Sequence, residues 1–168
     1  HDQTEAMTLG TRIVVMKDGI VQQVDTPINL YNYPVNLFVA GFMGSPSMNF
    51  IDAVVIEQGS DVKLSFGDMM IKVPEAKAKA LVNGGYVGKT VVMGIRPEDI
   101  HEEESWVNNP AKPNIEITVD VVEQLGPETL LYCKTSSEYT EGEDLKSIAE
   151  DVSNLIAKVD SRSATKAG

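Results

Sequence analysis

Few side chains in this sequence of 168 residues could perform catalysis or bind a metal ion. There are two histidines and one cysteine. His101 precedes a run of glutamates at positions 102–104, and this group could coordinate a divalent cation. Metal sites, however, combine several ligands at spaced positions rather than one histidine beside a run of carboxylates. The pattern is more typical of a solvated acidic loop, and we predict no metal site.

Cys133 and Trp106 are the remaining candidates for a chemical or binding role. A single cysteine cannot form an internal disulfide or a cysteine-built zinc site. Because Cys133 follows Tyr132 in an apolar run, we expect a small core residue. Trp106 lies in a loop after the acidic run, where it could anchor a partner or a sugar, or fold back over one end of the domain. We favour the second interpretation.

The charge balance limits the possible partners. Lys and Arg number 14 against 25 Asp and Glu, which gives a net charge of -11. A chain this acidic is repelled by nucleic-acid phosphates and by anionic lipids, so we do not expect a nucleic-acid-binding barrel. No stretch approaches the roughly 18 consecutive apolar residues of a membrane span, and residues 1–5 lack the features of a secretory signal. These features and the single cysteine predict a globular protein of the cytoplasm.

The elements that would position these residues fall into two regions. The first 48 residues predict a helix over 2–9 that ends near Gly10, a hairpin with arms 12–17 and 20–24, and short helices over 27–33 and 37–43. Asp18 and Gly19 between the arms suit a type I′ turn, in which both central residues have positive φ. Thr26 and Asn36 are suitable N-caps for the two short helices. The last helix is apolar on most sides, so it should be buried against something larger.

From residue 49 onward the pattern becomes mostly β. Predicted strands cover 52–57, 62–66, 69–73, 90–95, 115–121 and 129–134, and a predicted helix covers 76–82. Residues 115–121 alternate apolar and polar side chains without a break, which is typical of a half-buried strand. Residues 143–159 fit either a helix or a strand, and we predict a helix to about Asp151 followed by a strand over 154–159. The sequence therefore predicts a mainly β fold with short helices (α+β), in the form of a small barrel or a sandwich.

Several segments, in a fixed order, resemble a known family. His1–Leu9 with Arg12–Met16 resembles the end of the nucleotide-binding domain of ABC transporters, from the switch histidine onward. Gly19–Phe50 is similar to the ATPase subunits of the carbohydrate-import class, the family of the maltose importer ATPase subunit. Gly94–Asp99 and Val121–Thr129 resemble two landmarks of the regulatory domain of that class. One segment alone would be a weak signal, but their order makes the family assignment specific.

This resemblance implies a two-part architecture and a transport role. Residues 1–48 would be the C-terminal tail of the nucleotide-binding domain, and residues 49–168 a regulatory domain of the OB-like and MOP-like (TOBE) small β-barrel type, lacking its last strands. The parent protein would hydrolyse ATP with Mg²⁺ as a homodimer and drive the import of sugars or related polyol compounds. It would lie peripherally on the cytoplasmic face of the membrane, bound to permease subunits and to a cytoplasmic regulatory protein.

The resemblance also assigns roles to individual residues. His1 matches the switch histidine, which in the family contacts the γ-phosphate of ATP. At the first position of this chain it should be inactive. The regulatory landmarks are Arg96, Pro97 and Glu98 in one segment and Glu123, Gly126 and Glu128 in the other. We favour a structural latch over an interface for Arg96–Glu98, because proline fixes φ after a strand and Arg can pair with Glu locally.

The sequence also lacks several motifs of the family, and these differences are as informative as the similarities. The sequence has no glycine-rich P-loop ending in Lys-Ser or Lys-Thr, no signature sequence and no acidic Walker B strand. We therefore expect this chain alone to be inactive as an ATPase and to bind no cofactor. An alternative is a barrel that binds a small oxyanion, but such a site needs clustered cationic or hydroxyl side chains, and the net charge opposes it.

The resemblance also has a consequence for assembly. Removal of the main ATPase domain should leave apolar side chains exposed, and the missing last strands should leave an open sheet edge. The residues expected to be exposed are Ile13, Val15, Leu37, Phe38 and Phe42. We therefore predict a dimer or a swapped assembly, since association would cover both features.

Overall fold

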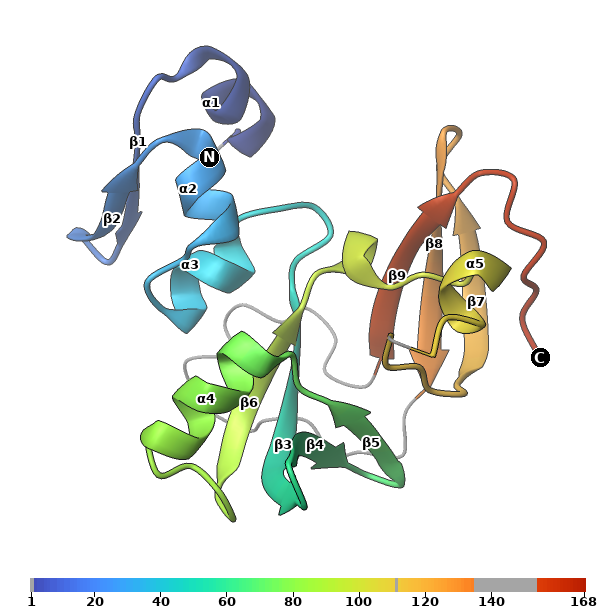
Figure 1. The fold of residues 1–168 in the computed structure, drawn as a ribbon. Coiled ribbons are helices and arrows are strands. Elements are labelled where there is room, and N and C mark those ends of the chain that lie inside the picture. Colours follow the sequence, from blue (N-terminus) through green and yellow to red (C-terminus); the bar gives the residue numbers. More distant parts are fainter. Residues whose placement is uncertain (1, 111, 135–153) are drawn as a thin grey trace. The chain divides into compact units, whose positions relative to one another are not determined.

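The computed structural model describes residues 2–110, 112–134 and 154–168. These residues divide into two compact units, one ending at Met48 and the other beginning at Asn49. Figure 1 labels the helices and strands of both units. Within the described ranges, no helix is both long enough and apolar enough to cross a membrane.

The first unit consists of short helices and a hairpin. Its elements are α1 (Gln3–Leu9), β1 (Ile13–Lys17), β2 (Ile20–Asp25), α2 (Pro27–Asn32) and α3 (Leu37–Phe42). Asp18 and Gly19 have φ values of 52° and 78°, as the predicted type I′ turn requires. The side chains of Thr26 and Asn36 accept hydrogen bonds from backbone N–H groups in the first turns of α2 and α3. Both predicted N-caps are therefore confirmed.

Val15 belongs to the core of this unit, so the prediction that it is exposed is wrong. Its side chain is 2% exposed and packs with Leu30, Val39 and Met43. Successive side chains of a strand point to opposite faces, and β1 turns Val15 toward the helices and its two neighbours outward. The short helices α2 and α3 thus bury Val15, which we expected only the main ATPase domain to bury.

The outward face of the hairpin is apolar. Its exposed residues form two cross-strand pairs, Val14 with Val24 and Met16 with Val21. On α3, Leu37 and Phe42 are exposed as predicted, whereas Ile13 on β1 and Phe38 on α3 are partly buried against the core. Contiguous apolar surface of this kind is usually an interaction surface.

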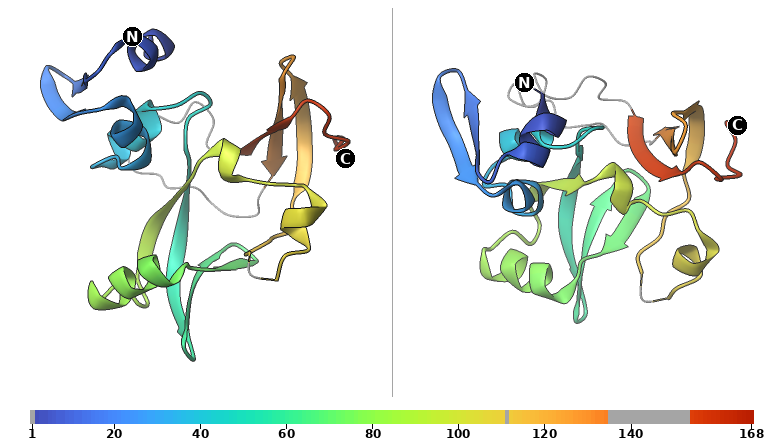
Figure 2. Two further views of the ribbon diagram at one scale, coloured as in Figure 1. Left: turned by 45° about the horizontal axis from the view of Figure 1, so that its top comes forward. Right: turned by 90° about the horizontal axis from the view of Figure 1, so that it is seen from above.

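The second unit contains two antiparallel sheets, one with the strand order β5-β4-β3-β6 and the other with the order β7-β8-β9. The strands are β3 (Asn49–Gln58), β4 (Asp61–Phe66), β5 (Met69–Lys72), β6 (Thr90–Ile95), β7 (Thr118–Gln124), β8 (Glu128–Lys134) and β9 (Asn154–Asp160). The helices are α4 (Glu75–Asn83), the short 3-10 helix η1 (Pro97–Asp99) and α5 (Glu104–Val107). Figure 2 shows η1 and α5 on the connection between β6 and β7, so this connection passes from one sheet to the other.

The sequence predicts a small barrel or a sandwich, and the described strands of this unit pair into two separate sheets rather than one closed barrel. The two sheets instead share one hydrophobic core, in which Ile51 and Val55 of the first sheet lie in the same cluster as Leu131 and Leu155 of the second. The fold is therefore mainly β, as predicted, but side chains rather than strand pairing join its two sheets.

Asn49 provides a polar link between the sheets. Its Nδ2 donates hydrogen bonds to the carbonyl oxygens of Ile95, at 3.0 Å, and Ile156, at 2.9 Å. The backbone N–H of Ile156 in turn donates to Asn49 Oδ1 at 2.8 Å. The amide side chain thus bonds one residue of β9 through both its N–H and its C=O, as a neighbouring strand would.

Strand β7 begins later than predicted. The sequence indicates residues 115–121, whereas the strand covers Thr118–Gln124. Its pairing with β8 shifts between Val119 and Val121, so one extra residue interrupts the alternation. As a result Val119 and Val122 pack against the core, while Val121 is exposed.

The last predicted elements are only partly covered by the structure. Strand β9 confirms the strand predicted over 154–159. The helix predicted to end at about Asp151 lies outside the described residues.

Candidate functional site

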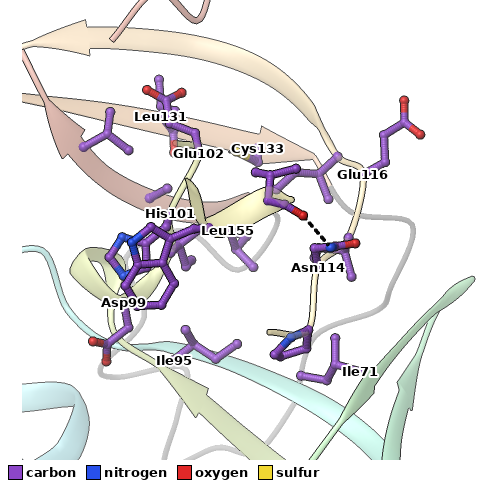
Figure 3. A pocket seen from close by; sticks show the side chains of 18 of the residues that line it. Ile71, Ile95, Asp99, His101, Glu102, Asn114, Glu116, Leu131, Cys133 and Leu155 are labelled. Atoms are coloured by element: carbon purple, nitrogen blue, oxygen red, sulfur yellow. Dashed lines mark hydrogen bonds between the residues drawn. The ribbon is translucent and has the colours of Figure 1, made fainter. Parts of the chain in front are cut away.

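The second unit contains a cavity of about 660 Å³. Its walls come from both sheets, including Ile71 of β5, Ile95 of β6, Cys133 of β8 and Leu155 of β9. The connection between β6 and β7 and Thr165, which follows β9, also contribute to its lining (Figure 3). Because most of these side chains are apolar, the cavity is an extension of the hydrophobic core that is open to the connecting loops.

Trp106 and His101 form an aromatic wall of this cavity. Their rings stack with centroids 3.8 Å apart and an interplanar angle of 14°. The ammonium group of Lys112 lies 4.4 Å from the centroid of the Trp106 ring, a cation–π arrangement. Trp106, although 38% exposed, is therefore packed by its own domain, in agreement with the interpretation that it folds back.

His101 makes contacts that differ from those of a metal ligand. Its Nδ1 lies 3.5 Å from Glu103 Oε2, and its ring stacks on Trp106. Among the described residues, no group of three or more histidine, cysteine or carboxylate side chains is gathered in a way that could hold a metal ion.

Three carboxylate side chains are among the residues that line the cavity. Asp99, Glu102 and Glu116 all contribute to its lining, and Glu102 accepts a hydrogen bond from the hydroxyl of Thr165. Burial, with a smaller contribution from the charge of Glu102, raises the pKa of the Cys133 thiol to about 11. Cys133 is therefore a protonated core residue, as the sequence predicts, and is unsuited to nucleophilic chemistry at neutral pH.

Arg96 and Pro97 lie where β6 ends. Arg96 is 6% exposed and Pro97 is buried, whereas Glu98 is partly exposed. Burial lowers the pKa of the Arg96 guanidinium, and the nearby negative charge of Asp99 opposes this shift. The helix η1, which begins at Pro97, packs against β9. The landmark Arg96–Glu98 therefore follows directly on Ile95, where the side chain of Asn49 also links the two sheets.

Glu123, Gly126 and Glu128 lie around the turn between β7 and β8. Gly126 has a φ of 89°, a conformation that favours glycine. Glu123 Oε2 accepts a hydrogen bond from the Tyr132 hydroxyl at 2.9 Å, and burial together with this neighbour raises the pKa of Tyr132. Glu128 Oε1 lies 3.0 Å from Lys158 Nζ on β9.

The structure brings both landmarks against one strand. Residues 97–99 pack on β9, and Glu128 forms an ion pair with Lys158 of the same strand. Both landmarks are recognisable in the sequence, whereas the roles of Asn49, which bonds Ile156, and Thr165, which bonds Glu102, are not. No local pattern indicates these two residues, because their partners are distant in the sequence. His1 lies outside the described residues.

Comparison with known proteins agrees with this geometry. Residues 44–100 match the family model described as the MalK OB fold domain. The whole chain is 40% identical to the oligosaccharides import ATP-binding protein MsmX of Bacillus subtilis (strain 168), of which it covers 41%. Over 80% of the chain, it is 46% identical to the osmoprotective compounds uptake ATP-binding protein GgtA of Synechocystis sp., and 44% identical to the trehalose/maltose import ATP-binding protein MalK of Thermococcus litoralis. The matches cover 36% of each of these two relatives.

The two sheets and the family match together define an OB-fold domain in the second unit. The chain belongs to the ATP-binding subunits of carbohydrate-import ABC transporters, and it spans about two fifths of the length of the first of these relatives. The recognition made from the sequence is therefore confirmed.

Proposed function

We propose that the parent protein of this chain hydrolyses ATP to drive the import of a sugar or a related polyol compound. The observation that carries the proposal is the match of the whole chain to an oligosaccharide import protein. The OB-fold match over residues 44–100 also overlaps the region where the regulatory domain is expected. In this proposal the chain is the regulatory part of an energy-coupling subunit and is not catalytic by itself.

We assign ATP and Mg²⁺ to parts of the parent protein outside this chain. The cavity of the second unit does not fit a triphosphate, because Asp99, Glu102 and Glu116 would repel it. The same carboxylates oppose the oxyanion-binding alternative. His1 would act in the parent protein by donating a hydrogen bond to the γ-phosphate, a role that rests on the resemblance alone.

The regulatory landmarks are proposed to maintain the shape of the OB-fold domain. Arg96, Pro97 and Glu98 would fix the corner between β6 and β9, which the burial of Arg96 and Pro97 supports. Glu123, Gly126 and Glu128 would fix the turn that aligns β7, β8 and β9. A domain held in this way could remain a constant interface while the nucleotide-binding parts open and close.

The proposed partners are a second copy of the same subunit, the permease subunits of the transporter and a cytoplasmic regulatory protein. The apolar outward face of the hairpin, with Val14, Met16, Val21 and Val24, supports the view that another part of the assembly covers this surface. In this proposal the subunit lies on the cytoplasmic face of the membrane.

An uptake assay tests the proposal. Cells lacking the full-length gene should lose uptake of a labelled oligosaccharide, maltose, trehalose or a polyol compound, and the wild-type gene should restore it. A full-length variant in which the residue matching His1 is alanine should be produced normally but fail to restore uptake. Unchanged uptake of every one of these solutes in the deletion strain would contradict the proposed function.

A further inference from the structure

The cavity of the second unit has the size of a ligand site. Protein interiors are close-packed, and voids larger than a water molecule are few. The volume of about 660 Å³ lies well within the range of about 300–1,000 Å³ found for small-molecule pockets. Within the ranges that the structure describes, the residues that line it belong to the second unit.

The interior and the rim of this cavity differ in chemistry. Ile95, Leu131 and Leu155 line the interior, which suits an apolar body. Asp99, Glu102 and Glu116 also belong to the lining, and Figure 3 shows Asp99 and Glu116 at the edges. An apolar pocket with a few polar groups is the usual form of a small-molecule site, in which the polar groups select the ligand.

The charges of the lining favour a cation over an anion. Asp99, Glu102 and Glu116 are carboxylates, whereas the ammonium group of Lys112 lies over the Trp106 ring. The chain as a whole carries a net charge of -11, which adds to the negative potential. A cationic group would therefore be attracted to the rim, and an anionic group would be repelled.

We propose that this cavity binds a small organic cation, a protonated amine on a compact apolar body. The apolar body lies between the two sheets, and the ammonium group lies against the Glu102 carboxylate. Glu102 is the favoured partner because it is only partly exposed and is oriented by the hydroxyl of Thr165. This site goes beyond the transport role and would give the OB-fold domain a ligand of its own.

The chain offers a direct reporter for this proposal. Trp106 is its only tryptophan and forms part of the cavity wall, so its fluorescence responds to occupancy. The probes are 2-phenylethylamine and 3-phenylpropionate, which have similar apolar bodies and opposite charges. We expect 2-phenylethylamine to give a saturable change in tryptophan fluorescence and 3-phenylpropionate to bind at least about tenfold more weakly.

Two charge variants provide the matched comparison. Glu102→Gln keeps an oxygen that can accept the hydrogen bond from Thr165 but removes the charge, so it should reduce the preference for the amine by about tenfold. Glu75→Gln changes the net charge equally on the exposed helix α4 and should leave both affinities unchanged. In a third variant, Ala157→Leu, the added volume should weaken binding of the amine.

Several outcomes would overturn the proposal. The first is the absence of a saturable fluorescence change with the amine, and the second is binding of 3-phenylpropionate that is as tight or tighter. The third is an equal effect of Glu75→Gln and Glu102→Gln on the preference for the amine. A fluorescence change that depends on protein concentration but not on the amine would also overturn it, because a second copy would then cover the cavity. The assay measures binding to this chain alone, so its outcome is independent of the uptake assay.

Discussion

The Asn49 link between the two sheets leads to a quantitative prediction. The substitution Asn49→Ala removes hydrogen bonds to Ile95 and Ile156 and leaves the backbone groups of Ile156 without this partner. The residue is only 8% exposed, so water can replace the lost bonds only in part. The OB-fold domain should therefore become less stable while keeping its fold.

The expected magnitude follows from these contacts. A hydrogen bond contributes about 1 kcal/mol net, and a buried polar group left unpaired costs about 1–3 kcal/mol. Three hydrogen bonds are lost. We therefore expect Asn49→Ala to lower the free energy of unfolding by about 3 kcal/mol.

Urea denaturation followed by Trp106 fluorescence measures this effect, since Trp106 lies in the same unit as Asn49. The midpoint should fall without a change in the m-value. Asn114→Ala is a matched control, because its exposed amide donates one hydrogen bond, to Val107 O at 3.0 Å, and should cost less than about 1 kcal/mol. A loss for Asn49→Ala no larger than that for Asn114→Ala would refute the reasoning.

Three further predictions follow from local features. Gly19→Ala should destabilise the first unit by about 1–2 kcal/mol, because alanine is strained at positive φ. Circular dichroism during denaturation measures this loss, and an unchanged midpoint would contradict the prediction. Cys133, the only thiol, should react with a thiol reagent far more slowly in the native protein than in urea, because burial raises its pKa to about 11; equal rates would contradict this. Hydrogen bonds from Arg162 lower the pKa of Asp160 to about 2. Because the pKa of this carboxyl is about 4 in the unfolded chain, the pair stabilises the fold fully above about pH 4. This contribution is lost as the pH falls toward 2. Arg162→Ala should raise the Asp160 pKa toward 3.8 in an NMR titration, and an unchanged value would contradict the assignment.

Local sequence signals predicted local structure well. The turn at Asp18 and Gly19 and the N-caps Thr26 and Asn36 were predictable because each depends on residues within one turn or loop. Strand β6 was predicted with its observed bounds, since its residues form a continuous β-branched and apolar run between turn signals.

Features that depend on distant contacts were not predictable. The irregularity between Val119 and Val121 changes which side chains face the core, although residues 115–121 alternate apolar and polar side chains. The partners of Asn49 and Thr165 lie far away along the chain, at Ile156 and Glu102. Burial of Val15 likewise depends on how α2 and α3 fold over the hairpin.

The central proposal is that this chain is the regulatory portion of an importer subunit whose ATPase activity lies elsewhere in the parent protein. Phosphate release from ATP with Mg²⁺ tests it most directly, when the full-length protein and this chain are compared at equal concentration. We expect the full-length protein to release phosphate and this chain to release none above the blank. Release by the purified chain, or none by an intact and folded full-length protein together with its permease subunits, would contradict the proposal.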